Sequence, residues 1–83
     1  MPLFMDVHRL DSGVSMEDAA KAHQADLAHQ GEHGVDYQRY WVDESQGRIF
    51  CLVEAPDAEA ARAVHQEAHG LVADEITEVK EGA

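Results

Sequence analysis

The sequence predicts an α+β domain whose segments follow the order β-α-β-β-α-β over 83 residues. Four segments alternate apolar and polar side chains or are rich in aromatic and β-branched residues, as strands are. Two alanine-rich segments follow residues that suit helix N-caps. A short loop that ends in Gly47 joins the two middle strands, which is typical of a hairpin. No stretch is rich in Pro, Gly or Ser, so we expect one domain over residues 1–83.

The first strand is expected over residues 3–9. Alternation places Phe4, Asp6 and His8 on one face and the odd-numbered apolar residues on the other. Asp6 and His8 are therefore close enough to share a ligand. A plain hydrogen bond between the two side chains is the ordinary structural alternative.

The first helix is expected to begin at Ser15. This residue is a suitable N-cap, and Asp18 three positions later completes a variant of the capping box. The helix is expected to end near Gly31 or Gly34, because glycine favours the left-handed conformation that terminates helices. A helical wheel places His23 near the middle of an apolar stripe that contains Met16, Ala19, Ala20 and Leu27.

The second half of the chain predicts a hairpin, a helix and a last strand. The hairpin strands cover residues 35–43 and 48–54, the helix begins at the N-cap Asp57 and ends at Gly70, and the last strand covers 71–80. The complete order is that of the ferredoxin-like fold, a four-stranded antiparallel sheet with both helices on one face.

Apolar side chains are expected on both faces of this sheet. The predicted sets are Phe4, Phe50 and Leu52 on one face and Met5, Ile49 and Val53 on the other. Two helices cover only one face, and a large uncovered apolar patch usually marks an interface. We therefore expect a homodimer that forms through the open sheet face.

The formal net charge of −11 excludes several classes of partner. Binding of nucleic acid, or of an anionic membrane surface, depends on an excess of Lys and Arg. No segment has the length of apolar sequence that a membrane span requires. The single Cys51 excludes an internal disulfide, and Asp6 interrupts the N-terminal segment before any signal-peptide pattern develops. The expected location is the cytoplasm.

Histidine is unusually frequent, with six residues on this acidic background. His65 and His69 are spaced i, i+4 on the second helix, so both rings can reach one ion. The wheel places both at the partly exposed border of an apolar stripe, where they could also be plain polar residues. Gln66 stands where a zinc peptidase of the H-E-x-x-H type has its glutamate, so a peptidase is not indicated.

The other histidines have structural interpretations beside the functional one. His23 is either a hydrogen-bonded core residue or a ligand, and Asp26 or Gln30 could orient it. His29 and His33 suit the negative end of the helix dipole. Cys51 lies among apolar neighbours and is expected to be a buried structural thiol. Imidazole together with carboxylate suits late first-row ions such as Ni²⁺, Cu²⁺, Zn²⁺ and Co²⁺, and such binding should weaken below about pH 6.

Several segments resemble a family of small bacterial ferredoxin-like proteins whose members are described as nickel-binding. The resemblance is clearest in Met5–His8, Tyr40–Glu44, Phe50–Pro56 and Val64–Ile76. It implies a homodimer that binds Ni²⁺ for sequestration or storage and has no established catalytic activity. Asp6, His8, His65 and His69 match the family pattern and are carried over as metal ligands. With His23 they form the candidate set, and His29 or His33 remain alternative ligands.

Two other functions remain open at the level of sequence. Dimeric α/β-barrel enzymes, among them small cofactor-independent oxygenases and isomerases, have a similar plan, and His23, His65, Tyr37 and Trp41 could line a pocket between sheet and helices. The chain could also be an interaction domain in which the histidines have no special role.

Overall fold

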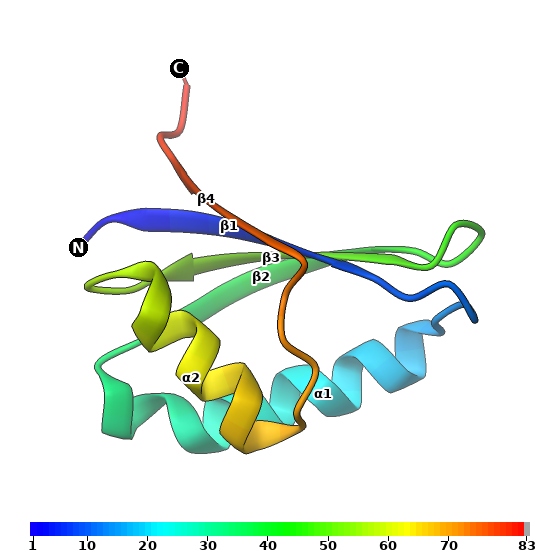
Figure 1. Cartoon of the computed structure of the whole chain (residues 1–83), viewed down its shortest axis with the longest axis horizontal. Helices are drawn as coiled ribbons and strands as arrows, with labels where there is room; N and C mark the ends of the chain where they lie inside the picture. Colours follow the sequence, from blue (N-terminus) through cyan, green and yellow to red (C-terminus); the bar gives the residue numbers. More distant parts are fainter. Residues whose placement is uncertain (83) are drawn as a thin grey trace.

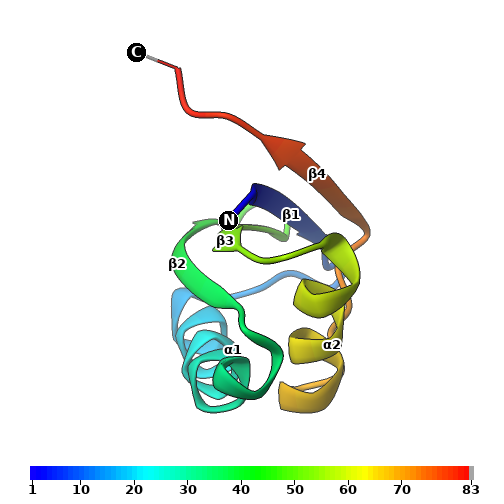
Figure 2. The same cartoon turned by 90° about the vertical axis from the view of Figure 1, so that its left-hand side faces the viewer.

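The computed structural model describes residues 1–82 and has the predicted element order. The elements are β1 (Leu3–Arg9), α1 (Met16–His29), the 3₁₀ helix η1 (Gln30–His33), β2 (Asp36–Asp43), β3 (Arg48–Glu54), α2 (Ala58–Ala68) and β4 (Glu75–Val79). The four strands form one antiparallel sheet in the order β2-β3-β1-β4. Both helices lie on the same side of this sheet, and no helix or strand of residues 1–82 covers its other face (Figures 1 and 2). The ferredoxin-like prediction is confirmed.

Local signals place the ends of both helices. The Ser15 hydroxyl accepts a hydrogen bond from the Asp18 backbone N–H at 3.1 Å, and the Asp57 carboxylate accepts one from the Ala60 N–H at 2.8 Å. Both bonds satisfy N–H groups that have no partner inside the helix. After α1 the chain continues as η1 up to Gly34, which has a φ of 65°. The predicted N-caps and the glycine stop are confirmed.

The last strand is shorter than the predicted range 71–80. β4 begins only at Glu75. The residue before it, Asp74, is held against β1 by one side-chain and one backbone hydrogen bond. The Asp74 carboxylate accepts a hydrogen bond from the Arg9 backbone N–H at 2.7 Å, and the Asp74 N–H donates one to the Val7 carbonyl at 2.9 Å.

The strand register corrects the predicted composition of the two sheet faces. Phe4 pairs with Val53, and Met5 pairs with Leu52. Phe4 therefore lies on the helix-covered face with Val53, and the predicted grouping of Phe4 with Phe50 and Leu52 was wrong. The alternation of side chains can be read within one strand, but which residues of two strands share a face depends on how the strands pair.

A β-bulge brings two tyrosines of β2 to the helix-covered face. Tyr37 pairs with Val53 and Arg39 pairs with Leu52, so two steps along β2 match one step along β3, and Tyr40 then pairs with Cys51. Strict alternation would send residues three apart to opposite faces, and the additional residue of the bulge removes this conflict. Tyr37 is buried as a result.

The buried face of α1 also differs from the predicted apolar stripe. Met16 and Leu27 are 48% and 39% exposed, whereas Ala19 and Asp26 are buried. Small and polar residues face inward here, so apolar character was a misleading guide to the orientation of this helix. A carboxylate on the inward face requires partners, and these lie in the core below α1.

The covered and open faces of the sheet have different compositions. The hydrophobic core between sheet and helices consists of Phe4, Ala19, Val35, Tyr37, Ile49, Cys51, Val53, Ala55, Ala61 and Val64. The opposite face presents apolar side chains from all four strands, which are Leu3, Met5, Val7, Trp41, Phe50, Leu52 and Val79. Over residues 1–82, neither helix has the length and apolar character needed to cross a membrane.

Candidate metal centre

Four polar side chains are buried between the sheet and the helices. Asp6 and His8 come from β1, Asp26 comes from α1, and His65 comes from α2, and each is at most 4% exposed. Ionisable groups in such a position require partners, because the loss of water is not otherwise compensated. The three elements bring their polar groups to one place.

His65 lies between two carboxylates. Its Nδ1 is 2.8 Å from Asp26 Oδ1, and its Nε2 is 2.9 Å from Asp6 Oδ2. Burial by itself would lower the pKa of His65, but the hydrogen bonds and charges of Asp26 and Asp6 outweigh it and raise the pKa to about 9. At neutral pH the ring is therefore an imidazolium that donates one hydrogen bond to each carboxylate.

The pKa values of the two carboxylates, Asp6 and Asp26, are lowered, whereas that of His65 is raised. Burial would raise the pKa of Asp6, but its interactions with His65 and His8 outweigh burial and hold the pKa well below its usual value. For Asp26, the hydrogen bonds of His65 and His69 likewise overcome burial and lower the pKa. Both groups are thus ionised throughout the physiological range.

The rings of His65 and His69 both hydrogen-bond the Asp26 carboxylate, and they do not converge on an empty position that one ion could occupy. His69 Nε2 is 3.0 Å from Asp26 Oδ1, and His69 Nδ1 accepts a hydrogen bond from the Leu71 N–H at 3.0 Å. His69 therefore carries its proton on Nε2 and donates it to Asp26. The expectation of a partly exposed pair was wrong for His65, which is 1% exposed, because its side of α2 faces both α1 and β1.

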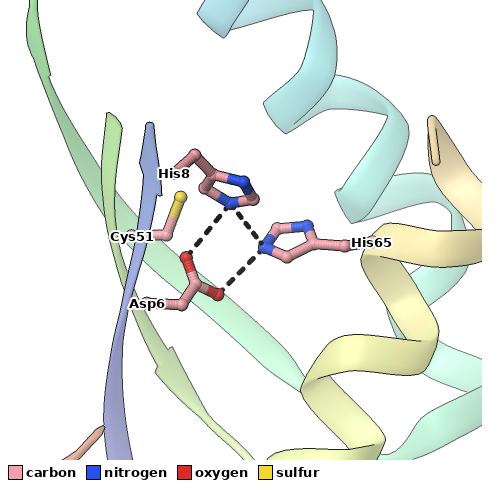
Figure 3. Close-up of side chains that lie close together, drawn as sticks. All are labelled: Asp6, His8, Cys51 and His65. Carbon is pink, nitrogen blue, oxygen red and sulfur yellow. Dashed lines mark hydrogen bonds and ion pairs between the residues drawn. The ribbon is translucent and has the colours of Figure 1, made fainter. Parts of the chain in front are cut away.

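Asp6, His8 and His65 form a cluster with Cys51. One ligand atom from each of the four residues lies within 4.8 Å of every other, and the side chains converge in Figure 3. His8 Nε2 is 3.4 Å from Asp6 Oδ1 and 3.3 Å from His65 Nε2. We refer to these four residues as the inner cluster.

One atom of the inner cluster lacks a partner. Asp6 Oδ2 accepts from His65 and can accept from the Tyr37 hydroxyl at 3.0 Å, whereas Asp6 Oδ1 is buried with no hydrogen bond from any residue of 1–82. A buried carboxylate oxygen without a donor is costly. A cation at Oδ1 would compensate for this cost, so the donor set fits a metal ion.

Cys51 is a buried thiol, which confirms the prediction, and it also lies beside the candidate metal ligands Asp6, His8 and His65. Burial, followed by the negative charge of Asp6, raises the pKa of Cys51. The thiol is therefore protonated when no metal is present. It reaches the cluster because β1 and β3 pair Asp6 directly with Cys51.

A cavity of about 20 Å³ adjoins the inner cluster, with room for a water-sized ligand. It is lined by His8, Ala19, Ala22, His23, Asp26, Tyr40, Ile49, Cys51, His65, His69 and Leu71. His23 packs on Tyr40 with ring centroids 4.7 Å apart. The suggested orienting bonds from Asp26 and Gln30 were wrong, because Asp26 bonds His65 and His69 and Gln30 bonds the Tyr37 N–H.

The pocket proposed for an enzyme differs from this cavity. His23 and His65 line the cavity, but Trp41 is 47% exposed on the open sheet face. Tyr37 is not among the lining residues, and its hydroxyl contacts Asp6 and Ala61. An organic substrate would need much more space than the cavity has.

The arrangement of buried histidines and carboxylates can be compared with known proteins. The family described as nickel responsive protein SCO4226-like matches residues 4–79. The chain belongs to this family. The crystal structure of SCO4226 from Streptomyces coelicolor A3(2) is similar with a TM-score of 0.90 and 46% sequence identity. The match covers 98% of this chain and 99% of that chain. No curated protein matches the sequence.

A second cluster of potential metal ligands lies near the surface. Glu32 and His33 of η1 face Glu67 of α2, and His33 Nε2 is 2.6 Å from Glu67 Oε2. We refer to these residues as the outer cluster. Among residues 1–82, the candidate ligand His33 joins such a cluster and the candidate His29 does not.

Asp26 and Cys51 are the site residues that the sequence interpretation missed. Asp26 was considered only as a partner for His23, and Cys51 only as a structural thiol. A usable signal for Asp26 was its spacing of seven residues from Ala19, which places both on one helix face. The signal for Cys51 was weaker, because its place beside Asp6 depends on the pairing of β1 with β3.

Proposed function

We propose that the chain binds Ni²⁺, or a similar divalent transition metal, with Asp6, His8 and His65 as its central ligands. The observation that carries this proposal is the buried Asp6 Oδ1, which lies 3.4 Å from His8 Nε2 and has no hydrogen-bond donor. Imidazole and carboxylate form a donor set that suits Ni²⁺. The family's description as nickel-responsive supports the choice of ion.

Asp26 prepares His65 for this role. A metal-ligating histidine usually donates its other ring N–H to a carboxylate, which fixes the ring and makes it a better ligand. Asp26 accepts from Nδ1 at 2.8 Å and so leaves Nε2 directed at the inner cluster. A cation must replace the Nε2 proton, and it then supplies the positive charge that the two buried carboxylates need.

The function of such binding is proposed to be sequestration or storage and not catalysis. The surplus of acidic residues attracts cations to the protein. His23 and His69 line the cavity beside the inner cluster, and both remain proposed ligands on its outer side. Because a proton leaves His65 on ligation, binding should be stronger at pH 7.5 than at pH 5.5.

Calorimetric titration of tag-free protein with NiCl₂ at pH 7.5 tests the proposal. His8→Gln should weaken binding by at least about tenfold, since it removes an imidazole ligand. His33→Gln in the outer cluster is the matched control and should leave the affinity unchanged. Circular dichroism verifies that both variants are folded. The opposite pattern would move the ion to the outer cluster, and no heat from the unmodified protein would refute nickel binding.

We further propose that two chains associate through the open sheet face. The apolar side chains of β1 and β3 on this face, among them Met5, Phe50 and Leu52, lie on the side of the sheet away from both helices and are partly exposed. An uncovered apolar patch of this kind is typical of an interface. A second copy of the chain would cover it with an identical surface, as twofold symmetry allows.

A further inference from the structure

The Cys51 thiol lies inside the donor set of the proposed metal site. Its sulfur is within 4.8 Å of the ligand atoms of Asp6, His8 and His65, and the residue is 6% exposed. β3 holds it there rigidly, because Cys51 pairs with Asp6 on one side and with Tyr40 on the other. In Figure 3 the sulfur points from β3 toward the same space as the His8 ring.

An independent observation shows that this space suits a cation. Asp6 is fully buried, and its Oδ1 has no donor although the Cys51 thiol and the His8 ring are its neighbours. A weak S–H donor does not satisfy a carboxylate as an N–H or a metal does. The carboxylate oxygen, the thiol and the imidazole therefore face one another without completing a hydrogen-bond network.

We infer that Cys51 ligates the bound metal as a thiolate, which makes the inner cluster a mixed carboxylate, imidazole and thiolate site. The inference rests on the proposed nickel binding and adds a ligand that the histidine-carboxylate set lacks. As the nickel–sulfur bond forms, the S–H bond breaks and its proton passes to solvent. No electron is transferred, so no oxidant or reductant is required.

Thiolate ligation changes the chemical class of ion that the site prefers. Carboxylate and imidazole alone bind Ni²⁺, Co²⁺ and Zn²⁺ with the usual order of affinities, whereas sulfur favours softer ions and disfavours Mg²⁺ and Ca²⁺ strongly. The site would therefore select a late transition metal against the much more abundant hard cations. Such selection is what a nickel-sequestering protein needs.

The test is a titration of the whole protein with NiCl₂ at pH 7.5, followed by near-ultraviolet absorption and calorimetry. A thiolate ligand gives a sulfur-to-nickel charge-transfer band, and Cys51 is the only cysteine of the chain, so the band has one possible source. We expect the band to grow until the inner cluster is saturated and to disappear when EDTA is added.

Cys51→Ser is the matched variant, because it replaces the sulfur by oxygen at nearly the same size. It should abolish the band and weaken nickel binding roughly tenfold, which corresponds to about 1.4 kcal/mol. Calorimetry in two buffers of different ionisation enthalpy should show about one proton fewer released per nickel ion than in the unmodified protein. The absorption of the unmodified protein decides the question even if the variant does not fold.

The outcomes separate this inference from the proposed function. Nickel binding without the band, or with equal affinity and proton release in Cys51→Ser, overturns thiolate ligation and leaves nickel binding by histidine and carboxylate intact. The absence of nickel binding in the unmodified protein refutes both. A charge-transfer band in the unmodified protein, together with weaker nickel binding by Cys51→Ser, establishes the thiolate ligand.

Discussion

His65 is the residue on which the candidate site depends. It contacts both carboxylates, lies 3.3 Å from His8 and stacks near Tyr37 and His69. Buried ion pairs add little net stability, because the loss of hydration offsets much of the attraction between the charges. A row of carboxylate, imidazolium and carboxylate in the core of a small domain is therefore better explained by a binding function than by stabilisation of the fold.

The role of Asp26 can be tested separately from that of the ligands. Asp26→Asn keeps the shape of the side chain but removes the charge that holds His65 Nδ1 and His69 Nε2. We expect nickel affinity to fall by about 10–100-fold, as for other carboxylates that orient a ligating histidine. Calorimetric titration measures the change.

The control for this substitution is Asp18→Asn. Asp18 lies on the same helix, is exposed, and carries the same charge, so its replacement should leave nickel affinity unchanged. Equal affinities in Asp26→Asn and the unmodified protein would show that Asp26 has no part in metal binding.

The raised pKa of His65 predicts how the stability of the metal-free protein depends on pH. The folded pKa of about 9 exceeds the unfolded value of 6.5, so the protonated ring stabilises the fold fully below 6.5 and this contribution is lost as the pH approaches 9. The pKa values of Asp6 and Asp26 are lowered, so their contribution is present above about 4 and is lost in acid.

Thermal unfolding of the EDTA-treated protein measures this dependence. The Tm should be highest between about pH 4 and 6.5 and should fall by roughly 5–15 °C up to pH 9, since 1 kcal/mol shifts the Tm of a domain this size by about 4–8 °C. In Asp26→Asn the decline on the alkaline side should be smaller. A Tm that is constant or rises between pH 6.5 and 9 would contradict the assignment of His65 as an imidazolium.

At the scale of elements, the fold was predictable because its signals are local. N-cap bonds such as Ser15 to Asp18 involve residues three positions apart, and the alternation that buries Asp6 and His8 is contained within one strand. The hairpin loop depends on Gly47, where φ is 71° and any Cβ would collide with the Leu10 carbonyl. Each of these features is determined by a few neighbouring residues, so the sequence alone indicates it.

The features that assemble the site are not local, and they could not be predicted in the same way. The bulge in β2, the rotation of α1 that buries Asp26, and the pairing of Asp6 with Cys51 all depend on how elements fit one another. A one-residue change of register would exchange the two faces of a strand, and nothing within the strand forbids it. The histidines were therefore identified as candidates, whereas their partners Asp26 and Cys51 were not.

At the scale of the whole molecule, the sheet separates two surfaces of different composition. The face under the helices (Figure 2) contains the inner cluster. By the strand register, the opposite face carries the apolar side chains of the proposed dimer interface. A hollow on that face is lined by Leu3, Met5, Leu52, Val79, Lys80 and Glu81. Because the sheet lies between the two surfaces, changes at one should leave the other unaffected.

Replacement of Leu52 by Lys tests both the dimer and this independence. Leu52 pairs with Met5 in the middle of the open face, so a charge there would be buried without a partner in a dimer. We expect light scattering to give the mass of a dimer for the unmodified protein and of a monomer for Leu52→Lys at micromolar concentration. Stable interfaces bury roughly 800 Å² per partner, and a lysine at the centre disrupts most of the apolar contact.

Gln24→Lys provides the control, because it adds the same charge at an exposed position of α1 and should remain dimeric. Leu52→Lys should keep its circular dichroism and its nickel affinity, since the inner cluster is built from one chain. A monomeric unmodified protein would refute the proposed interface. Loss of nickel binding together with the dimer would mean that the partner chain contributes to the site, and the two surfaces would then act as one.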